Sequence, residues 1–379
     1  MLVKKYLDDD VVTAARKRVT SIFDSGANVA LDFSGGKDSI VLADVVYKLL
    51  VRGRIKADQL IVEFIDEEGM FDDVIELTKK WRVKFMQEGV PFHWYCLPVK
   101  HFNCLNTLSE EETFICWEPN EEKNWIRKKP EFAINDHPLL IPRKDNYQMF
   151  LYRLRNADGK IAMTGVRCAE SVQRLRSMAK KKNFIADNKC NPIYDMSDKD
   201  VWLYIYKNNL EIPQTYENIY RTGGTRRDMR ISQFFSIDTA KRLVNLSEMY
   251  PDLMDRVIRR EPNAYLCAMY WDTEMFGRST QKRKKLEGDS KTDYKTKIYE
   301  LLKNPNLLET DHQKDILERF RKPIVLDGES LSNKLYKKMY ECIYTGDPKC
   351  RTQRAIMENL YHELKMTYQE QKRSASKNG

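Results

Sequence analysis

A glycine-lysine-aspartate string near the N-terminus constrains the fold of this chain more than any other sequence feature. Residues 29–33 form a short apolar run, Ser-Gly-Gly-Lys-Asp-Ser follows at 34–39, and apolar residues then recur at helical spacing up to residue 51. This pattern predicts a strand, a glycine turn and a helix. Adjacent glycines permit positive φ and close backbone approach, and a helix N-terminus offers unpaired N–H groups and the positive end of its dipole. The turn is therefore predicted to bind phosphate or pyrophosphate.

Polar side chains of the string strengthen this interpretation. Lys37 adds a full positive charge, and Ser34 and Ser39 add hydroxyl donors. The alternative is an ordinary Gly-Gly turn in which Asp38 or its neighbour only caps the helix. The complete string, directly after a strand and before a well-formed helix, favours phosphate binding. Its spacing is neither that of a Walker A loop nor that of a Gly-x-Gly-x-x-Gly dinucleotide site.

Further strands and helices alternate along the first half of the chain. Strands are predicted at 60–65, 91–97 and 160–166, and helices at 8–25 and 71–88. This alternation predicts an α/β fold with a parallel sheet flanked by helices. An aperiodic stretch at about 100–145 is predicted to be an insertion.

Two carboxylates follow the second predicted strand. Asp66 and Glu67 would lie at the carboxyl edge of the sheet, where open α/β folds bind ligands. They could contact nucleotide hydroxyls or Mg²⁺, or they could simply begin a polar loop. The residues alone leave both interpretations open.

A second polar cluster follows the strand predicted at 160–166. The chain there places Gly165, Arg167, Glu170, Ser171 and Arg174 at the same sheet edge. Arginine suits bidentate recognition of phosphate or sulfate. We expect Arg167 and Arg174 to bind an anion.

From about residue 238 the pattern is predominantly helical. We therefore predict a nucleotide-binding domain at 1–235, which contains the insertion, and a helical C-terminal domain at 236–379. Helices are predicted at 239–249, 254–268, 294–302, 314–321 and 331–344, with a polar connection at 281–295.

Composition narrows the class of protein. The chain has 379 residues, a formal net charge of +9 and 32% charged residues, which permits a phosphate-rich or nucleic-acid partner without requiring one. No apolar stretch has the length of a membrane span, and acidic residues stand where a signal peptide would be apolar, so a cytoplasmic protein is expected. The eight cysteines form no Cys-x-x-Cys pair, which favours reduced thiols and predicts neither zinc nor an iron-sulfur cluster.

The Ser-Gly-Gly-Lys-Asp-Ser string resembles the PP-loop of the ATP pyrophosphatase superfamily. The later Gly-Val-Arg-x-x-Glu-Ser-x-x-Arg run, Pro-Ile-x-Asp at 192–195, Asp-Val-Trp at 200–202 and Ile-Pro at 212–213 follow in the order seen in the phosphoadenosine phosphosulfate (PAPS) reductase family. This resemblance covers about residues 25–225 and implies an adenine-nucleotide alpha-hydrolase-like fold. The Cys-Trp-Glu-Pro insertion and helical C-terminus are similar to the immunoglobulin-binding regulator A type proteins of bacteria and phages, whose genes often lie beside one for a ParB-like partner.

One departure from the reductases matters for the reaction. Their catalytic cysteine lies in Glu-Cys-Gly-x-His, and this chain lacks that motif. The resemblance therefore implies cleavage of ATP between its α and β phosphates, with adenylation of an acceptor in sulfur transfer or nucleic-acid modification. PAPS reduction is the runner-up, and a non-catalytic nucleotide sensor with a ParB-like partner is the third candidate. The acceptor and the oligomeric state stay open.

The resemblance also implies roles for individual residues. Lys37, Asp38 and Arg167 are the expected catalytic residues, and Asp38 with Asp66 would position Mg²⁺. The second, anionic substrate would meet Arg167, Glu170, Ser171 and Arg174. ATP and its pyrophosphate would be held by Ser34, Gly35, Gly36, Lys37, Asp38, Ser39, Asp66 and Gly165.

Overall fold

The computed structural model divides into two compact units, which are described separately. The first comprises Met1–His101 and Phe114–Ala268, and the second comprises Phe102–Thr113 and Met269–Gly379. The boundary predicted at residue 235 stays a prediction. The structure describes residues 8–106, 113–179, 185–186, 188–225, 228–240, 242, 247–270, 292–328, 331–345 and 356–357.

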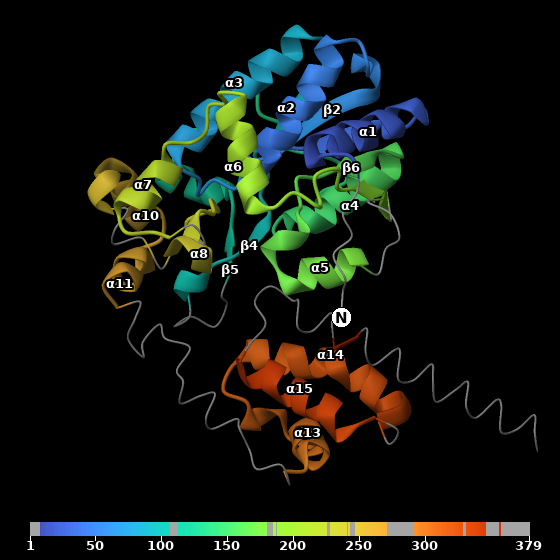
Figure 1. The fold of residues 1–379 in the computed structure, drawn as a ribbon. Coiled ribbons are helices and arrows are strands. Elements are labelled where there is room, and N and C mark those ends of the chain that lie inside the picture. Colours follow the sequence, from blue (N-terminus) through green and yellow to red (C-terminus); the bar gives the residue numbers. More distant parts are fainter. Residues whose placement is uncertain are drawn as a thin grey trace, which may run out of the picture. The chain divides into compact units, whose positions relative to one another are not determined.

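A six-stranded sheet forms the centre of the first unit (Figure 1). Its order is β3-β2-β1-β6-β8-β7, and all neighbouring pairs are parallel except β7 with β8. The predicted α/β class with a parallel sheet flanked by helices is confirmed. The strands are β1 (Val29–Asp32), β2 (Leu60–Ile65), β3 (Phe92–Tyr95), β6 (Ile161–Met163), β7 (Ile185–Ala186) and β8 (Lys189–Cys190).

This strand order creates a switch point beside β1. The chain runs outward from β1 through β2 to β3 and then returns to place β6 on the other side of β1. Loops that leave the carboxyl ends of β1 and β6 consequently start side by side at the sheet edge where open α/β folds bind ligands. The loop at 33–36 and the loop at 164–167 are the two segments involved.

Helices of the first unit follow the predicted periodicity closely. α2 starts at Lys37, because Gly36 with extended backbone is its N-cap. Helix α1 contacts α2, and α2 contacts α6. The helices are α1 (Val11–Asp24), α2 (Lys37–Val51), α3 (Asp72–Gln87), α4 (Tyr147–Asp158), α5 (Val172–Ala179), α6 (Asp198–Lys207), α7 (Thr215–Arg221), α8 (Ile237–Ala240), α10 (Pro251–Arg260) and α11 (Asn263–Tyr270), with short 3-10 turns η1 (Ala57–Gln59) and η4 (Cys168–Glu170).

The single helix predicted at 254–268 is wrong. Two helices, α10 and α11, occupy this stretch, and Glu261 between them has φ −141° and ψ 89°. Pro262 follows, and a residue before proline is driven out of helical geometry. Of the helix predicted at 239–249, residues 241 and 243–246 lie outside the described residues, as do 281–291 of the predicted connection.

The predicted insertion contains short regular elements. β4 (Lys100–Phe102) and β5 (Thr113–Ile115) form a two-stranded sheet, and η2 (Cys104–Asn106) and η3 (Pro119–Asn124) are 3-10 turns. Fully buried Glu68 fixes part of this region to the first unit. Its carboxylate accepts the N–H of Trp117 at 2.6 Å and pairs with Arg260 at 2.8 Å.

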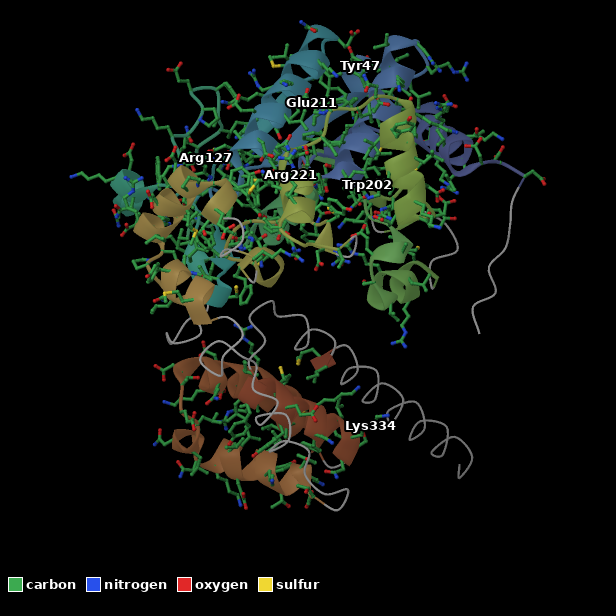
Figure 2. The ribbon with its side chains drawn as sticks, turned by 60° about the vertical axis from the view of Figure 1, so that its left-hand side comes forward. Tyr47, Arg127, Trp202, Glu211, Arg221 and Lys334 are labelled. Carbon is green, nitrogen blue, oxygen red and sulfur yellow. The ribbon has the colours of Figure 1, made fainter. Side chains whose placement is uncertain are left out.

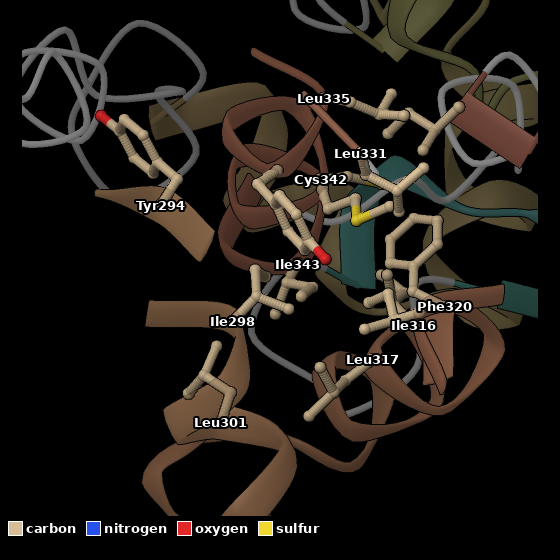
Figure 3. Packing of buried hydrophobic residues seen from close by; sticks show 14 of the residues in the cluster. Tyr294, Ile298, Leu301, Ile316, Leu317, Phe320, Leu331, Leu335, Cys342 and Ile343 are labelled. Carbon is tan, nitrogen blue, oxygen red and sulfur yellow. The ribbon is translucent and has the colours of Figure 1, made fainter. Parts of the chain in front are cut away.

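The described part of the second unit is helical, as predicted. It contains α13 (Tyr294–Lys303), η6 (Pro305–Leu307), α14 (Asp311–Asp327) and α15 (Asn333–Thr345). Figure 3 shows side chains from these helices meeting in one apolar cluster, in which Ile298, Ile316, Phe320 and Tyr336 are fully buried. Among the described helices of the whole chain, none is long and apolar enough to cross a membrane.

Candidate nucleotide-binding site

The turn between β1 and α2 depends on Gly35. Its φ of +71° is a conformation that side chains with a Cβ rarely adopt. A Cβ at this position would also lie 2.6 Å from Cγ1 of Val74 and 3.1 Å from Oγ1 of Thr78, both in α3. Only glycine therefore lets the turn lie directly against the start of α3.

Backbone N–H groups of this turn are available to an anion. The N–H of Ser34 donates to Oγ of Ser39 at 3.2 Å, and that hydroxyl donates to the carbonyl of Gly36 at 2.9 Å. In the part of the chain that the structure describes, the N–H groups of Gly35, Gly36 and Asp38 have no acceptor. These donors lie at the N-terminus of a 15-residue helix, whose dipole also favours negative charge.

Lys37 is buried beside this turn, with 5% of its surface exposed. Its Nζ donates to the carbonyl of Met229 at 2.9 Å and lies 3.6 Å from Asp38 and 3.9 Å from Asp198. Burial lowers the pKa of the Lys37 ammonium, because a charged group loses its hydration there. A phosphate oxygen would replace part of that hydration.

The loop after β6 lies against the start of α2. A Cβ on Gly165 would lie 3.1 Å from backbone atoms of Asp38 and Ser39, so a glycine allows the two loops to touch. Nε of Arg167 donates to Asp38 at 2.8 Å, and its Nη2 lies 3.7 Å from Asp198. The structure thus joins two sequence-predicted clusters that lie about 130 residues apart.

Other predicted anion-binding residues lie on η4 and α5. Glu170 accepts the backbone N–H of Arg167 at 2.9 Å and pairs with Arg174. Oγ of Ser171 accepts the backbone N–H of Arg174 at 3.1 Å. These contacts hold the segment together, and their direct role toward a substrate stays a prediction.

Asp66 has a different environment from the PP-loop-like turn. Its side chain is fully buried, its Oδ2 accepts from Nε1 of Trp94 at 2.8 Å, and its Oδ1 pairs with Arg127. Glu68 donates its N–H to the same Oδ1 at 3.1 Å. The carboxylate therefore ties Arg127 of the insertion to the end of β2, and its predicted magnesium role stays a prediction.

Sequence reasoning missed Asp198 as a member of the site. The resemblance drew attention only to Asp-Val-Trp at 200–202 in this stretch, and Ser197 and Asp200 form a capping box at the start of α6. Asp198 is left to approach Lys37 and Arg167 instead. The sequence contained one signal for this role. The first turn of α6 has two acidic residues, and one of them is enough to complete the cap.

Tyr216 of α7 was missed as well, since nothing in the sequence links it to the turn. Its buried hydroxyl accepts the N–H of Lys37 at 2.8 Å, where the predicted pyrophosphate would bind.

We expect Tyr216→Phe to bind pyrophosphate several-fold more tightly and to lower the free energy of unfolding by about 1 kcal/mol, because the N–H loses its partner in the free protein. Calorimetric titration measures the affinity, and Tyr206→Phe is the control, because the Tyr206 side chain is exposed on α6. Weaker pyrophosphate binding by Tyr216→Phe would contradict this competition.

Comparison with known proteins agrees with this geometry. Residues 28–230 match the phosphoadenosine phosphosulfate reductase domain. The uncharacterized protein YbdN of Escherichia coli is 27% identical over 263 residues, which are 64% of this chain and 63% of YbdN. The chain therefore spans less than two thirds of that relative.

Two solved structures are also similar to this chain, with lower sequence identity than YbdN. The U34-tRNA thiolase NcsA of Methanococcus maripaludis, with its [4Fe-4S] cluster, has a TM-score of 0.32 and 15% identity, over 68% of this chain and 78% of that chain. The PAPS reductase of Candida auris has a TM-score of 0.31 and 14% identity, over 62% of this chain and 98% of that chain. Because the family match covers more than half of the residues, this chain belongs to the phosphoadenosine phosphosulfate reductase domain family of the PP-loop superfamily.

Proposed function

We propose that the protein cleaves ATP between its α and β phosphates and transfers AMP to an acceptor. The observation that carries this proposal is the set of N–H groups on Gly35, Gly36 and Asp38 that have no acceptor among the described residues, next to Lys37 in the chain. An oxygen of the acceptor attacks the α phosphorus, the bond to the bridging oxygen breaks, and pyrophosphate leaves with that bond's electron pair. The N–H groups and Lys37 stabilise the charge that develops on the leaving group.

Arg167 orders this site from the loop after β6. It is 3% exposed and bridges Asp38 and Asp198, so both carboxylates keep a fixed position next to the turn. An anionic group of the acceptor would be attracted to the same guanidinium. In this proposal Arg167 holds the acceptor, while Lys37 faces the leaving group.

The residues present also fit a magnesium ion carried by the nucleotide. Magnesium in such sites takes one or two carboxylates and completes its shell with phosphate oxygens and water. Asp38 and Asp198 supply these carboxylates close to Lys37 and Arg167. When bound, the ion would neutralise charge on the phosphates.

Thiol chemistry has less support than adenylation. Among the cysteines whose side chains the structure describes, Cys168 is the one that is partly exposed, and it follows Arg167 directly. Burial raises the pKa of the Cys168 thiol, which disfavours the thiolate that would attack a sulfonucleotide. PAPS reduction therefore remains the second candidate.

Incubation with Mg²⁺ and α-labelled ATP, with candidate acceptors, tests the proposal. We expect labelled AMP, free or on the acceptor, together with an equal amount of pyrophosphate. Release of ADP and phosphate would place cleavage at the wrong bond and contradict the proposal. Tight ATP binding without any product would favour the sensor with a ParB-like partner, as the likeness to the regulator A type proteins suggests. Sulfite release from PAPS would favour the reductase.

A further inference from the structure

A second basic site lies in the first unit, outside the turn that binds the nucleotide. An open pocket of about 1020 Å³ is formed by the insertion around η3 and by α10. One carboxylate, that of Glu122, lines it. Six cationic residues also line it: Lys123, Arg127, Lys128, Lys129, Arg256 and Arg259.

Two of these cations are neutralised by the protein itself. Arg127, labelled in Figure 2, pairs with buried Asp66, and Arg256 pairs with Asp72 and donates to the carbonyl of Ile126 at 2.9 Å. These pairs fix the pocket wall. They connect the insertion and α10 to the ends of β2 and α3.

The other four cations leave a positive surplus. Lys123, Lys128 and Arg259 are exposed, Lys129 is half-buried, and none of the four forms an ion pair with a described residue. A pocket with four such cations and a single carboxylate attracts a ligand with several negative charges. One isolated phosphate would not use them all.

An indole ring adds an aromatic surface to the same wall. Nζ of Lys129 lies 4.5 Å from the ring centroid of Trp125, and Nε1 of Trp125 donates to the carbonyl of Glu118 at 2.9 Å, which fixes the ring. Burial lowers the pKa of Lys129, while nearby carboxylates such as that of Glu122 oppose this shift. Cations that track phosphates and an aromatic ring on which bases stack are the two components of single-strand binding sites.

The pocket and the nucleotide turn both contact the first turn of α3. Asp72 pairs with Arg256 of the pocket, and Val74, two residues later, is the side chain against which Gly35 packs. A chain bound in the pocket therefore lies near the place where AMP would be transferred. The volume is at the upper end for small-molecule sites and the pocket is open, which suits an extended ligand better than a free nucleotide.

We propose that this pocket binds single-stranded nucleic acid, with phosphates on Lys123, Lys128, Lys129 and Arg259 and a base beside Lys129 on Trp125. The assignment of the bound strand as the AMP acceptor rests on the proposed adenylation. The binding site itself does not depend on that proposal. The pocket residues hold the strand, and the PP-loop residues carry out the reaction.

Fluorescence anisotropy of the full chain with a labelled strand of about 16 nucleotides, measured without ATP, tests the site. We expect Lys128→Gln combined with Arg259→Gln to weaken binding on the order of tenfold and to lower the salt slope of the affinity by about 1.4. The matched control is Arg54→Gln with Lys56→Gln, which removes two exposed cations next to η1 without an ion pair. ATP affinity is expected to be the same in all three proteins.

The proposal is overturned by no strand binding, by equal loss in the pocket and control variants, or by loss of ATP rather than strand affinity in the pocket variant. Duplex DNA and an acidic peptide are run in parallel, and a preference for either also overturns it. If the pocket variant weakens strand binding while no nucleic acid stimulates AMP release, the pocket is confirmed and the acceptor assignment fails. AMP release with a different acceptor and no strand binding would refute both the strand-binding pocket and the acceptor assignment, while the proposed adenylation would stand.

Discussion

Lys37→Met is expected to lower AMP and pyrophosphate formation by about 10²–10³-fold. The substitution keeps the apolar stem of the side chain and removes the ammonium that lies 3.6 Å from Asp38 and 3.9 Å from Asp198. Stability should change little, since burial lowers the pKa of Lys37 and its charge is costly in the free protein. Asp38 and Asp198 keep Arg167 as a partner.

Quench-flow or steady-state assays with α-labelled ATP measure this loss. Lys48→Met is the matched control, because Lys48 lies near the end of the same helix and pairs with Asp44 at 2.7 Å, away from the turn. The control should retain the rate of the unmodified protein. An unchanged rate in Lys37→Met, with the fold intact by circular dichroism, would sink the assignment of the turn.

Gly35→Ala is expected to unfold the first unit at distinctly lower denaturant concentration and to abolish nucleotide binding. Two costs add: positive φ strains any residue with a Cβ by about 1–2 kcal/mol, and the new methyl group meets Val74 and Thr78 in α3, which adds about 1–3 kcal/mol. The turn would also shift away from the position in which its N–H groups converge.

Gly53→Ala separates these two costs. Gly53 has φ +65°, close to that of Gly35, but a Cβ there would meet nothing within 4 Å. Gly53→Ala should therefore lose only the stability that positive φ costs a residue with a Cβ, and it should keep ATP binding. Denaturant titration followed by tryptophan fluorescence reports on the first unit, where five of the six tryptophans lie at 81, 94, 117, 125 and 202. Equal losses in both variants would show that the contact with α3 contributes nothing.

The burial of Asp32 gives the stability of the sheet a pH dependence. Burial raises the pKa of Asp32 to about 6. The ion pair with Arg155, and the 30% of the side-chain surface that stays exposed, both limit this rise. The folded protein therefore holds this proton more tightly than the unfolded chain, so stability is expected to fall as pH rises from about 4 to 6. Asp32→Asn should flatten the plot of unfolding free energy against pH between about 4 and 6. If that slope is the same in the variant, Asp32 is not the group that causes it.

Local patterns in the sequence predicted most secondary structure of the first unit. The strand at 60–65 was predicted with its observed bounds, and those at 29–33 and 91–97 to within two residues, because each is a short buried run between polar turns. The helix at 254–268 was wrong because its apolar spacing continues across Pro262, which ends it. Periodicity reports which face is buried and does not reveal that a backbone donor is missing.

The sequence by itself determined that a phosphate-binding turn joins a strand to a helix, since Gly35, Gly36 and Lys37 are consecutive and act locally. Only the tertiary structure decided what surrounds that turn. Arg167 and Asp198 reach it because the strand order places β6 beside β1, and Tyr216 reaches it from a helix still further along the chain. Asp66, predicted as part of the site, pairs with Arg127 of the insertion, a contact that only the tertiary structure reveals. Such contacts depend on which strands become neighbours, a long-range choice that the residue spacing around any one motif does not encode.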